Sequence, residues 1–186
     1  MAHIARTTLL TLVAAALGSA PALAAPAVTG TPKVSFVATG GAFIPDIEGT
    51  TTALKVANDG TALLFTVGLS NLTSGIDLRD QHMREKYLEA PKFPEATLKI
   101  ERSALSFPAA GGEKKKGKAA GTFTVHGVSQ PVNVGYTLVK TNAGYKVDAT
   151  FNLDLTKHGI PIPEYELVSV EKDVVAAASF EFSDAP

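Results

Sequence analysis

GIDLRDQHMREKYLEAPKFPEATLKI, residues 75–100, is the stretch that decides the fold. In this stretch the apolar residues Ile76, Met83 and Tyr87 recur at about the 100° per residue of a helix, whereas the rest of the chain alternates between apolar and polar residues. Pro91 and Pro94 then return the chain to an extended strand. The pattern predicts a single helical insert in a protein that is otherwise made of strands.

The polar residues of this insert have two interpretations. We expect Asp77 to cap the helix and Asp80 to lie in the first turn, where the helix dipole favours an anion. Arg79 and Asp80 flank the apolar stripe, whereas His82 points away from it. Asp80 and Arg84 have the favourable i,i+4 order. The favoured interpretation is a lid anchored by charge-assisted hydrogen bonds, and the alternative is a polar mouth of Arg79, Asp80 and His82 that binds a ligand head group.

Segments on both sides of the insert alternate with period two, as half-buried strands do. The expected strands are Lys33–Thr39, Glu48–Ala57, Thr61–Ser70, Ala96–Phe107, Ala119–His126, Val132–Lys140, Tyr145–Leu155 and Glu166–Phe182. Turns or polar connections are expected at 58–60, 109–118, 127–131, 142–144 and 158–163. Lys172-Asp173 interrupts the last strand and predicts a bulge.

Short connections favour antiparallel pairing. A sheet with one apolar face buries that face by closing into a barrel or by packing on a second sheet. Because the strands are long and adjacent in sequence, we expect an all-β fold, an antiparallel barrel of about eight strands with one short helical insert. A β-sandwich is the alternative.

Composition excludes several classes of function. The chain has 186 residues, 45% hydrophobic and 19% charged, which is typical of one globular domain. A formal net charge of -1 gives no broad basic surface, so no nucleic-acid partner is expected. The absence of cysteine excludes disulfides, zinc–thiolate sites and a thiol nucleophile.

The N-terminus has the layout of a secretory signal peptide. His3 and Arg6 precede the apolar run Leu9–Leu17, and Ala22-Leu23-Ala24 provides a small-x-small cleavage site. We expect residues 1–24 to be removed and residues 25–186 to form one domain in the periplasm or outside the cell. A membrane anchor is the alternative, but the apolar run is too short to span a bilayer.

No pattern typical of catalysis or metal binding is found. His82, His126 and His158 lack the close spacing of a metal site, and no serine lies in a Gly-x-Ser-x-Gly sequence. No glycine-rich phosphate loop follows a strand. We therefore expect neither a cofactor nor a metal, and no enzyme activity.

Three motifs resemble those of the YceI-like family. RDQHM, residues 79–83, with Phe93-Pro94 resembles that family's Arg-Asp-x-His-Leu segment and the aromatic-proline pair that follows it. Residues 121–131, GTFTVHGVSQP, resemble its Gly-x-Leu-Thr-Leu-x-Gly-x-Thr-x-Pro hairpin, and residues 151–160 with Asp173-Val174 resemble its C-terminal strands. Two departures are Gly30-Thr31-Pro32-Lys33 in place of the family's opening Asp, His and Ser pattern, and Tyr87-Leu88 in place of its aromatic pair.

The resemblance implies a lipocalin-like barrel, exported to the periplasm, that holds a polyisoprenoid chain in an apolar interior without a catalytic constellation. The interior residues expected to bind the ligand are Phe36, Phe65, Val67, Phe123, Tyr136, Ala149, Phe151, Ala176, Ala178 and Phe180. The residues expected to form the lid or mouth are Ile76, Arg79, Asp80, His82, Met83 and Tyr87.

Small inward residues predict space for such a ligand. Gly121, Ala149, Ala176 and Ala178 would leave a channel along one wall of the barrel. Burying one five-carbon isoprene unit contributes at most roughly 3–4 kcal/mol, at about 0.8 kcal/mol per methylene. Because association costs about 4–15 kcal/mol, several units must enter the barrel.

Three functional hypotheses follow. The first is a carrier or sequestering protein for an isoprenoid lipid, a quinone or a polyprenol, which could contact a membrane surface or a membrane redox protein transiently. The second is an enzyme on a hydrophobic substrate with Asp80 and His82 as an acid–base pair, although residues two apart on a helix do not share a face. The third is a stress-associated interaction module with a packed, ligand-free core.

Overall fold

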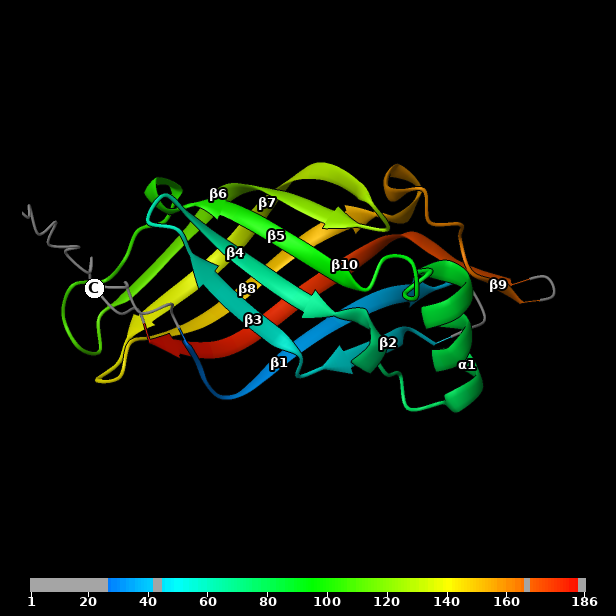
Figure 1. Cartoon of the computed structure of the whole chain (residues 1–186), viewed down its shortest axis with the longest axis horizontal. Helices are drawn as coiled ribbons and strands as arrows, with labels where there is room; N and C mark the ends of the chain where they lie inside the picture. The colour runs from blue at the N-terminus through cyan, green and yellow to red at the C-terminus, as the bar shows by residue number, and fades with distance from the viewer. Residues whose placement is uncertain (1–26, 42–44, 166–167, 184–186) are drawn as a thin grey trace, which may run out of the picture.

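The expected antiparallel barrel is present, with more strands than the sequence predicts (Figure 1). The computed structural model describes residues 27–41, 45–165 and 168–183, so the expected signal segment 1–24 lies outside the described residues. Hydrogen-bonded neighbours follow the order β2-β1-β10-β8-β7-β6-β5-β4-β3, and β9 pairs with the start of β10. The two additional strands are the short β9 and one half of a segment expected to be continuous.

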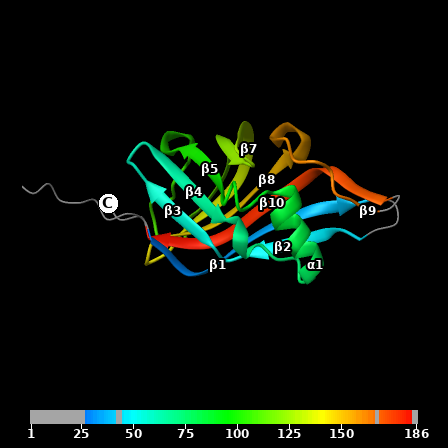
Figure 2. The ribbon, with the colours of Figure 1, turned by 45° about the vertical axis from the view of Figure 1, so that its right-hand side comes forward.

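The strands are β1 (Ala27–Gly40), β2 (Ile47–Thr51), β3 (Leu54–Asn58), β4 (Ala62–Gly68), β5 (Glu95–Glu101), β6 (Lys114–Val125), β7 (Val128–Lys140), β8 (Tyr145–Asp154), β9 (Glu164–Tyr165) and β10 (Val168–Ser183). The helical segments are η1 (Leu69–Asn71), α1 (Asp77–Gln81), η2 (His82–Tyr87), η3 (Arg102–Ala104) and η4 (Leu155–His158). Figures 1 and 2 place α1 at one end of the barrel, the end where β9 also lies. Among the described residues, no helix is long and apolar enough to cross a bilayer.

The expected strand 48–57 is split, and the split nearly closes the barrel. β2 pairs with β1, whereas β3 pairs with β4 at the opposite edge of the sheet. Only Thr52 and Ala53 lie between them, so one short extended segment joins both edges. The prediction of one continuous strand is wrong because alternation reports which face a residue occupies and not which neighbour the backbone pairs with.

The seam between the two edges is bridged beyond β4. Thr50 N donates to Thr73 O at 2.7 Å, and Thr73 N donates to Thr50 O at 3.0 Å. Gly68 N also donates to Ala53 O at 3.2 Å. The segment after β4 therefore covers part of the edge that β2 would otherwise leave unpaired.

The boundaries of β5 and β6 differ from expectation, and β1 and β7 begin earlier than expected, at Ala27 and Val128. β5 ends at Glu101 instead of Phe107, because the turn η3 follows it directly. Lys114–Lys118, expected to belong to a polar connection, is the first part of β6, with Lys114 paired to Val139. Lysines can occupy a strand whose outer face is exposed, because pairing uses only the backbone.

The turn between β6 and β7 is tighter than the expected 127–131. Val125 pairs with Val128, so the loop is His126-Gly127, and the two residues have φ values of 54° and 74°. Positive φ at both positions is typical of a two-residue type I′ hairpin. The predicted turns at 58–60 and 142–144 are confirmed by the β3–β4 and β7–β8 pairings.

The predicted bulge in the last strand is confirmed. Ala38 pairs with Val174 and Gly40 pairs with Val170, so β10 has two more residues than β1 in this interval. Lys172 lies in the bulge, where its Nζ is 3.0 Å from Asp154 and from Asp173. Lys172-Asp173, the charged pair that interrupts the alternation, thus lies where the register between β1 and β10 shifts.

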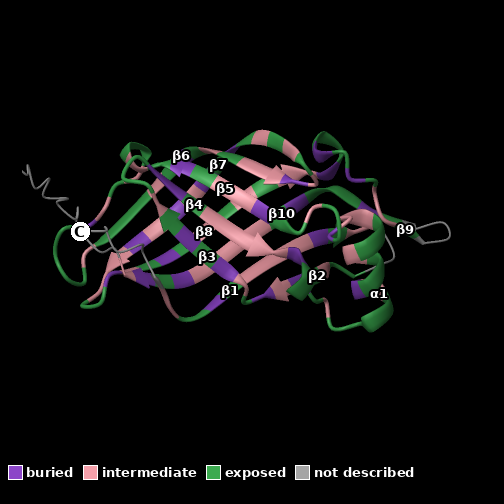
Figure 3. Cartoon of the chain, in the orientation of Figure 1, coloured by how far each residue is buried: buried purple, intermediate pink, exposed green. Residues whose placement is uncertain are grey.

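Burial alternates along the strands, and the apolar faces meet inside the barrel (Figure 3). One cluster of buried residues includes Tyr136, Leu138 and Phe182. A second cluster includes Leu69 and Leu155 and packs against Tyr87 of the helical insert. The insert is therefore part of the core at its end of the barrel.

A glycine-to-alanine pair tests the packing of β2 against β1. A Cβ at Gly49 would lie 2.0 Å from the Phe36 ring, whereas a Cβ at Gly135 would lie 3.7 Å from Thr150 O. We expect Gly49→Ala to lower the free energy of unfolding by about 1–3 kcal/mol because the ring must move. Gly135→Ala, the control, should change it by about 0.5 kcal/mol or less. Equal urea midpoints for both variants would contradict this packing.

Candidate functional site: an apolar cavity with a helical lid

The interior of the barrel contains a cavity of about 770 Å³. Its lining comes from both ends and all sides of the barrel and from the helical insert, and is almost entirely apolar. The side chains with polar atoms in the lining are Ser35, Arg79, His82, Tyr87, Tyr136 and Glu164. A volume of this size is typical of small-molecule pockets.

The sequence-predicted interior residues are brought together around this cavity. All of them contribute to its lining: Phe36, Phe65, Val67, Phe123, Tyr136, Ala149, Phe151, Ala176, Ala178 and Phe180. Sequence reasoning did not select Val34, Leu98 or Leu138 as ligand-binding, although each is an inward position of an expected strand. Leu105 and Phe107 were missed because the expected strand 96–107 ran through them, and its period puts them on the face opposite Leu98 and Ile100; β5 in fact ends at Glu101.

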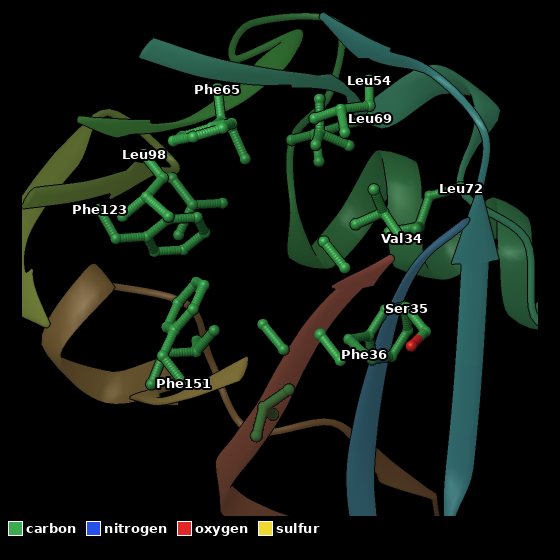
Figure 4. A pocket seen from close by; sticks show the side chains of 18 of the residues that line it. Val34, Ser35, Phe36, Leu54, Phe65, Leu69, Leu72, Leu98, Phe123 and Phe151 are labelled. Atoms are coloured by element: carbon green, nitrogen blue, oxygen red, sulfur yellow. The ribbon is translucent and has the colours of Figure 1, made fainter. Parts of the chain in front are cut away.

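Aromatic rings form one wall of the cavity. The ring centroids of Phe123 and Phe151 are 4.9 Å apart, and those of Phe65 and Phe180 are 5.8 Å apart. Figure 4 shows Phe65, Phe123 and Phe151 on one side of the cavity, with Phe36 across from them. Such rings give large apolar surfaces with few rotatable bonds.

Small residues form another part of the wall. Ala149 and Ala178 are direct cross-strand partners, and Ala176 lies opposite Phe151. Gly121, which was grouped with them, does not line the cavity. A Cβ at Gly121 would lie 2.9 Å from Lys99 O, so this glycine allows close packing of β6 on β5 and does not widen the channel.

The lid begins differently from the expected helix. Ile76 occupies the N-cap position, and neither it nor Asp77 supplies a side-chain cap, so the expectation for Asp77 is wrong. After Gln81 the chain continues as a π-helix, in which Leu88 N donates to Met83 O at 2.9 Å. Ile76 is 53% exposed, although it was expected in the buried stripe, because it is an extended residue before the helix and the 100° wheel does not apply to it.

Five of the six expected lid residues nevertheless line the cavity: Ile76, Arg79, His82, Met83 and Tyr87. His82 was expected to point away from the apolar stripe, but it is an exposed residue of the cavity lining. Asp80 is the exception, because it does not line the cavity and is 4% exposed.

Asp80 holds the segment that bridges the seam. Its Oδ2 accepts from Thr73 Oγ1 at 2.5 Å, and its Oδ1 accepts from Ser74 N at 2.6 Å and from Ser74 Oγ. Thr73 is also the residue whose backbone pairs with Thr50. One buried carboxylate therefore connects the lid to the closure of the barrel.

Electrostatics keep Asp80 ionised. Burial raises the pKa of Asp80, but hydrogen bonds from Ser74 and Thr73 and the charge of Arg84 outweigh burial and leave this pKa below its ordinary value of 3.8. A buried carboxylate with a low pKa and both oxygens accepting hydrogen bonds is poorly suited to proton transfer at neutral pH. This geometry speaks against Asp80 as half of an acid–base pair.

Arginines of the lid bind the same segment. Arg79 donates from Nε to Ser74 Oγ at 2.7 Å and from Nη2 to Ser74 O at 2.9 Å. Arg84 donates from Nη1 to Leu72 O at 3.2 Å. Through these bonds the half-buried Arg79 is held in the lining of the cavity.

The other end of the lid meets the β6–β7 turn. Glu89 and His126 are the non-glycine residues with positive φ among those described, at 45° and 54°. Their side chains are close, with His126 Nε2 3.5 Å from Glu89 Oε1, and Phe93 packs edge-on against the His126 ring at 4.9 Å. Two strained residues therefore meet where the lid returns to the barrel.

The third histidine, His158, is buried and contacts the backbone. His158 is 1% exposed, and its Nδ1 is 3.0 Å from Val128 O. Across residues 27–41, 45–165 and 168–183, no three His, Asp or Glu side chains gather in a group that could hold a metal ion.

The fold and cavity together define a lipocalin-like β-barrel with an apolar internal cavity. The model of the YceI-like domain family matches residues 28–182, and the chain belongs to this family. The family and the site indicate a binding protein more than an enzyme.

Solved structures share this fold. A polyisoprenoid binding domain from Saccharophagus degradans, implicated in plant cell wall breakdown, aligns with a TM-score of 0.70 at 15% identity, over 87% of this chain and 99% of that one. BcnA from Burkholderia cenocepacia aligns with a TM-score of 0.62 at 19% identity, over 80% and 94%. The YCEI protein of Campylobacter jejuni aligns with a TM-score of 0.53 at 17% identity, over 74% and 86%. The search of curated proteins gave no significant match.

Replacing Asp80 tests the lid anchor. In Asp80→Asn one acceptor oxygen becomes a donor, so the bond from Thr73 or from Ser74 is lost, and we expect a loss of about 1–3 kcal/mol of unfolding free energy at neutral pH. Because the folded-state pKa is lowered, this contribution is present above the ordinary pKa of 3.8 and disappears as pH falls through the lower folded value.

Thermal melts of both proteins between pH 7 and pH 3 measure this difference. Asp77→Asn is the matched control, because Asp77 is exposed in the same turn and makes no capping bond. The anchor is refuted if Asp80→Asn melts like the wild type at pH 7, or if the difference grows as pH falls.

Proposed function

We propose that this protein binds a long-chain isoprenoid lipid of the quinone or polyprenol type inside its barrel, as a carrier or sequestering protein in the periplasm. The observation that carries the proposal is the cavity of about 770 Å³ with an almost completely apolar lining. Such a lining stabilises a hydrocarbon chain and leaves strongly polar ligands without partners.

The volume fits several isoprene units. At about 30 Å³ for each water-sized group, a cavity of about 770 Å³ holds roughly 25 such groups, the carbons of about five isoprene units. One unit contributes at most roughly 3–4 kcal/mol, so five units contribute at most roughly 15–20 kcal/mol. This total supports micromolar binding, about 8 kcal/mol, when association costs up to about 7–12 kcal/mol of its range of about 4–15. A short alcohol fills too little of the cavity to do so.

The mouth supplies the few polar groups a head group needs. Arg79 and His82 both line the cavity at the lid and both carry N–H donors, which suit the carbonyl oxygens of a quinone or the oxygen of a polyprenol. In this proposal the interior residues hold the chain, while Ile76, Met83 and Tyr87 cover the mouth.

Two further observations support the proposal. A structural neighbour is described as a polyisoprenoid binding domain, and this chain covers 99% of it. Residues 1–24 have the layout of an export signal, so the domain formed by residues 25–186 would act outside the cytoplasm. A large cavity counts against a ligand-free module with a packed core.

Filling the small wall should block loading. In Ala149→Phe with Ala178→Phe, two rings would occupy the space beside a cross-strand pair of alanines that lines the cavity. We expect at least a tenfold loss of polyprenol binding, measured by retention of radiolabelled lipid after gel filtration. Ala120→Phe on the exposed face of β6 is the control and should bind normally. Undiminished binding by the folded double variant would show that the lipid does not use this wall.

Affinity should depend on chain length. We expect it to rise with each added unit up to about five isoprene units, because each unit buries more apolar surface, and then to level off as further units remain outside the cavity. Competition by a series of isoprenols with increasing unit number measures this dependence. A flat series, or a continued rise far beyond five units, would contradict the proposed occupancy.

A further inference from the structure

We propose that the lid end of the barrel docks onto a lipid bilayer through Ile76 and Leu78, so that the cavity mouth opens directly into the bilayer. The inference rests on the proposed function and names the partner from which the ligand enters. Both residues belong to the start of the helical insert at one end of the barrel (Figure 1).

Exposure of large apolar side chains is concentrated at this place. Among the described residues the exposed large apolar side chains are Ile76 at 53%, Leu78 at 63%, Leu64 at 40% and Val175 at 41%. Ile76 and Leu78, the most exposed of these, also line the cavity, whereas Leu64 and Val175 do not. Single apolar side chains on a surface are common and need no function. An exposed apolar surface that continues into an apolar cavity, however, indicates an entry route for a ligand.

The anchor of the lid explains why these side chains are exposed. Asp80 faces inward to Thr73 and Ser74 and is buried. With the helix fixed in this orientation, Ile76 and Leu78 cannot turn into the core without breaking those bonds. The side chains of Ile76 and Leu78 are therefore exposed whenever the protein is folded with this anchor in place.

Charges on the same segment suit a zwitterionic membrane surface. Residues 76–87, which contain the apolar pair, carry three acidic and three basic side chains, so no net charge dominates: Asp77, Asp80, Glu85, Arg79, Arg84 and Lys86. Phosphocholine-type head groups carry both signs, and the apolar residues can enter the interface below them. We therefore commit to a bilayer, including an uncharged one, as the occupant of this surface.

The chemistry of the ligand favours a bilayer over a protein partner. A long isoprenoid lipid is concentrated in membranes, and its passage through water costs free energy for every exposed methylene. Docking with Ile76 and Leu78 in the interface lets the chain pass from the bilayer to the cavity along a continuous apolar surface.

Site-specific fluorescence tests the contact. The chain contains no cysteine, so Leu78→Cys creates a unique site for an environment-sensitive dye, and Leu64→Cys is the matched control on another exposed leucine. With phosphatidylcholine vesicles we expect a blue shift of the dye at residue 78 and none at residue 64. No shift at residue 78, or equal shifts at both, would overturn the proposal and leave this surface to a protein partner.

Lipid transfer separates this inference from the proposed function. In Ile76→Asp with Leu78→Asp, extraction of polyprenol from vesicles should be at least tenfold slower than in wild type. Because both residues also line the cavity, this loss should be compared with the loss in binding of polyprenol supplied in detergent, and it should be the larger of the two. Leu64→Asp with Val175→Asp, the control, should do both like wild type. Wild-type extraction rates in the lid variant would overturn the docking proposal. Failure of the wild type to bind lipid even from detergent would instead overturn the proposed function.

Discussion

The pair of backbone hydrogen bonds between Thr50 and Thr73 is the contact on which the rest of the structure depends. Without it, the sheet that begins at β2 and ends at β3 would have an open edge beside its apolar interior. The bridge draws the segment after β4 against β2, next to the short link between β2 and β3. This contact and the short link between β2 and β3 together nearly close the barrel around its apolar cavity.

The same segment connects barrel closure to the lid. Asp80 binds Thr73 and Ser74, and Arg79 binds Ser74, so the lid holds the bridge in place and the bridge orients the lid. At the other end of the insert, Glu89 and His126 contact each other with positive φ at both residues. The mouth of the cavity is thus defined by two attachments of a short, irregular helix. In our account, the charged residues of the insert hold the lid in position and bind the head group of the ligand. The apolar residues of the insert form the route by which the ligand enters.

Period-two alternation made the interior predictable. It identified residues such as Phe65, Ala149 and Phe180 because a strand position that faces inward keeps that direction whichever strand it pairs with. Turn chemistry likewise predicted the hairpin at residues 58–60, where Asp59 accepts from Thr61 N and Ala62 N. The family resemblance rested on motifs of the insert, of the β6–β7 hairpin and of residues 151–160 with Asp173-Val174.

Other features depend on contacts that no local pattern reports. The segment 48–57 is split because its two halves pair with different strands, and the alternation of apolar and polar residues does not report which strand the backbone pairs with. Ile76 is exposed as the extended N-cap residue before α1, a position to which a helical wheel does not apply. Burial of Asp80 requires Thr73 and Ser74 to approach it from the preceding loop, and their spacing in the sequence does not reveal that approach.

The central claim is that the barrel carries an isoprenoid chain in its cavity. The most direct measurement is native mass spectrometry of the purified full chain, followed by extraction and identification of whatever lipid accompanies it. We predict a one-to-one complex whose mass difference equals that of an extractable isoprenoid lipid. A protein that is always recovered empty, and stays empty after incubation with polyprenols and quinones, would contradict the account.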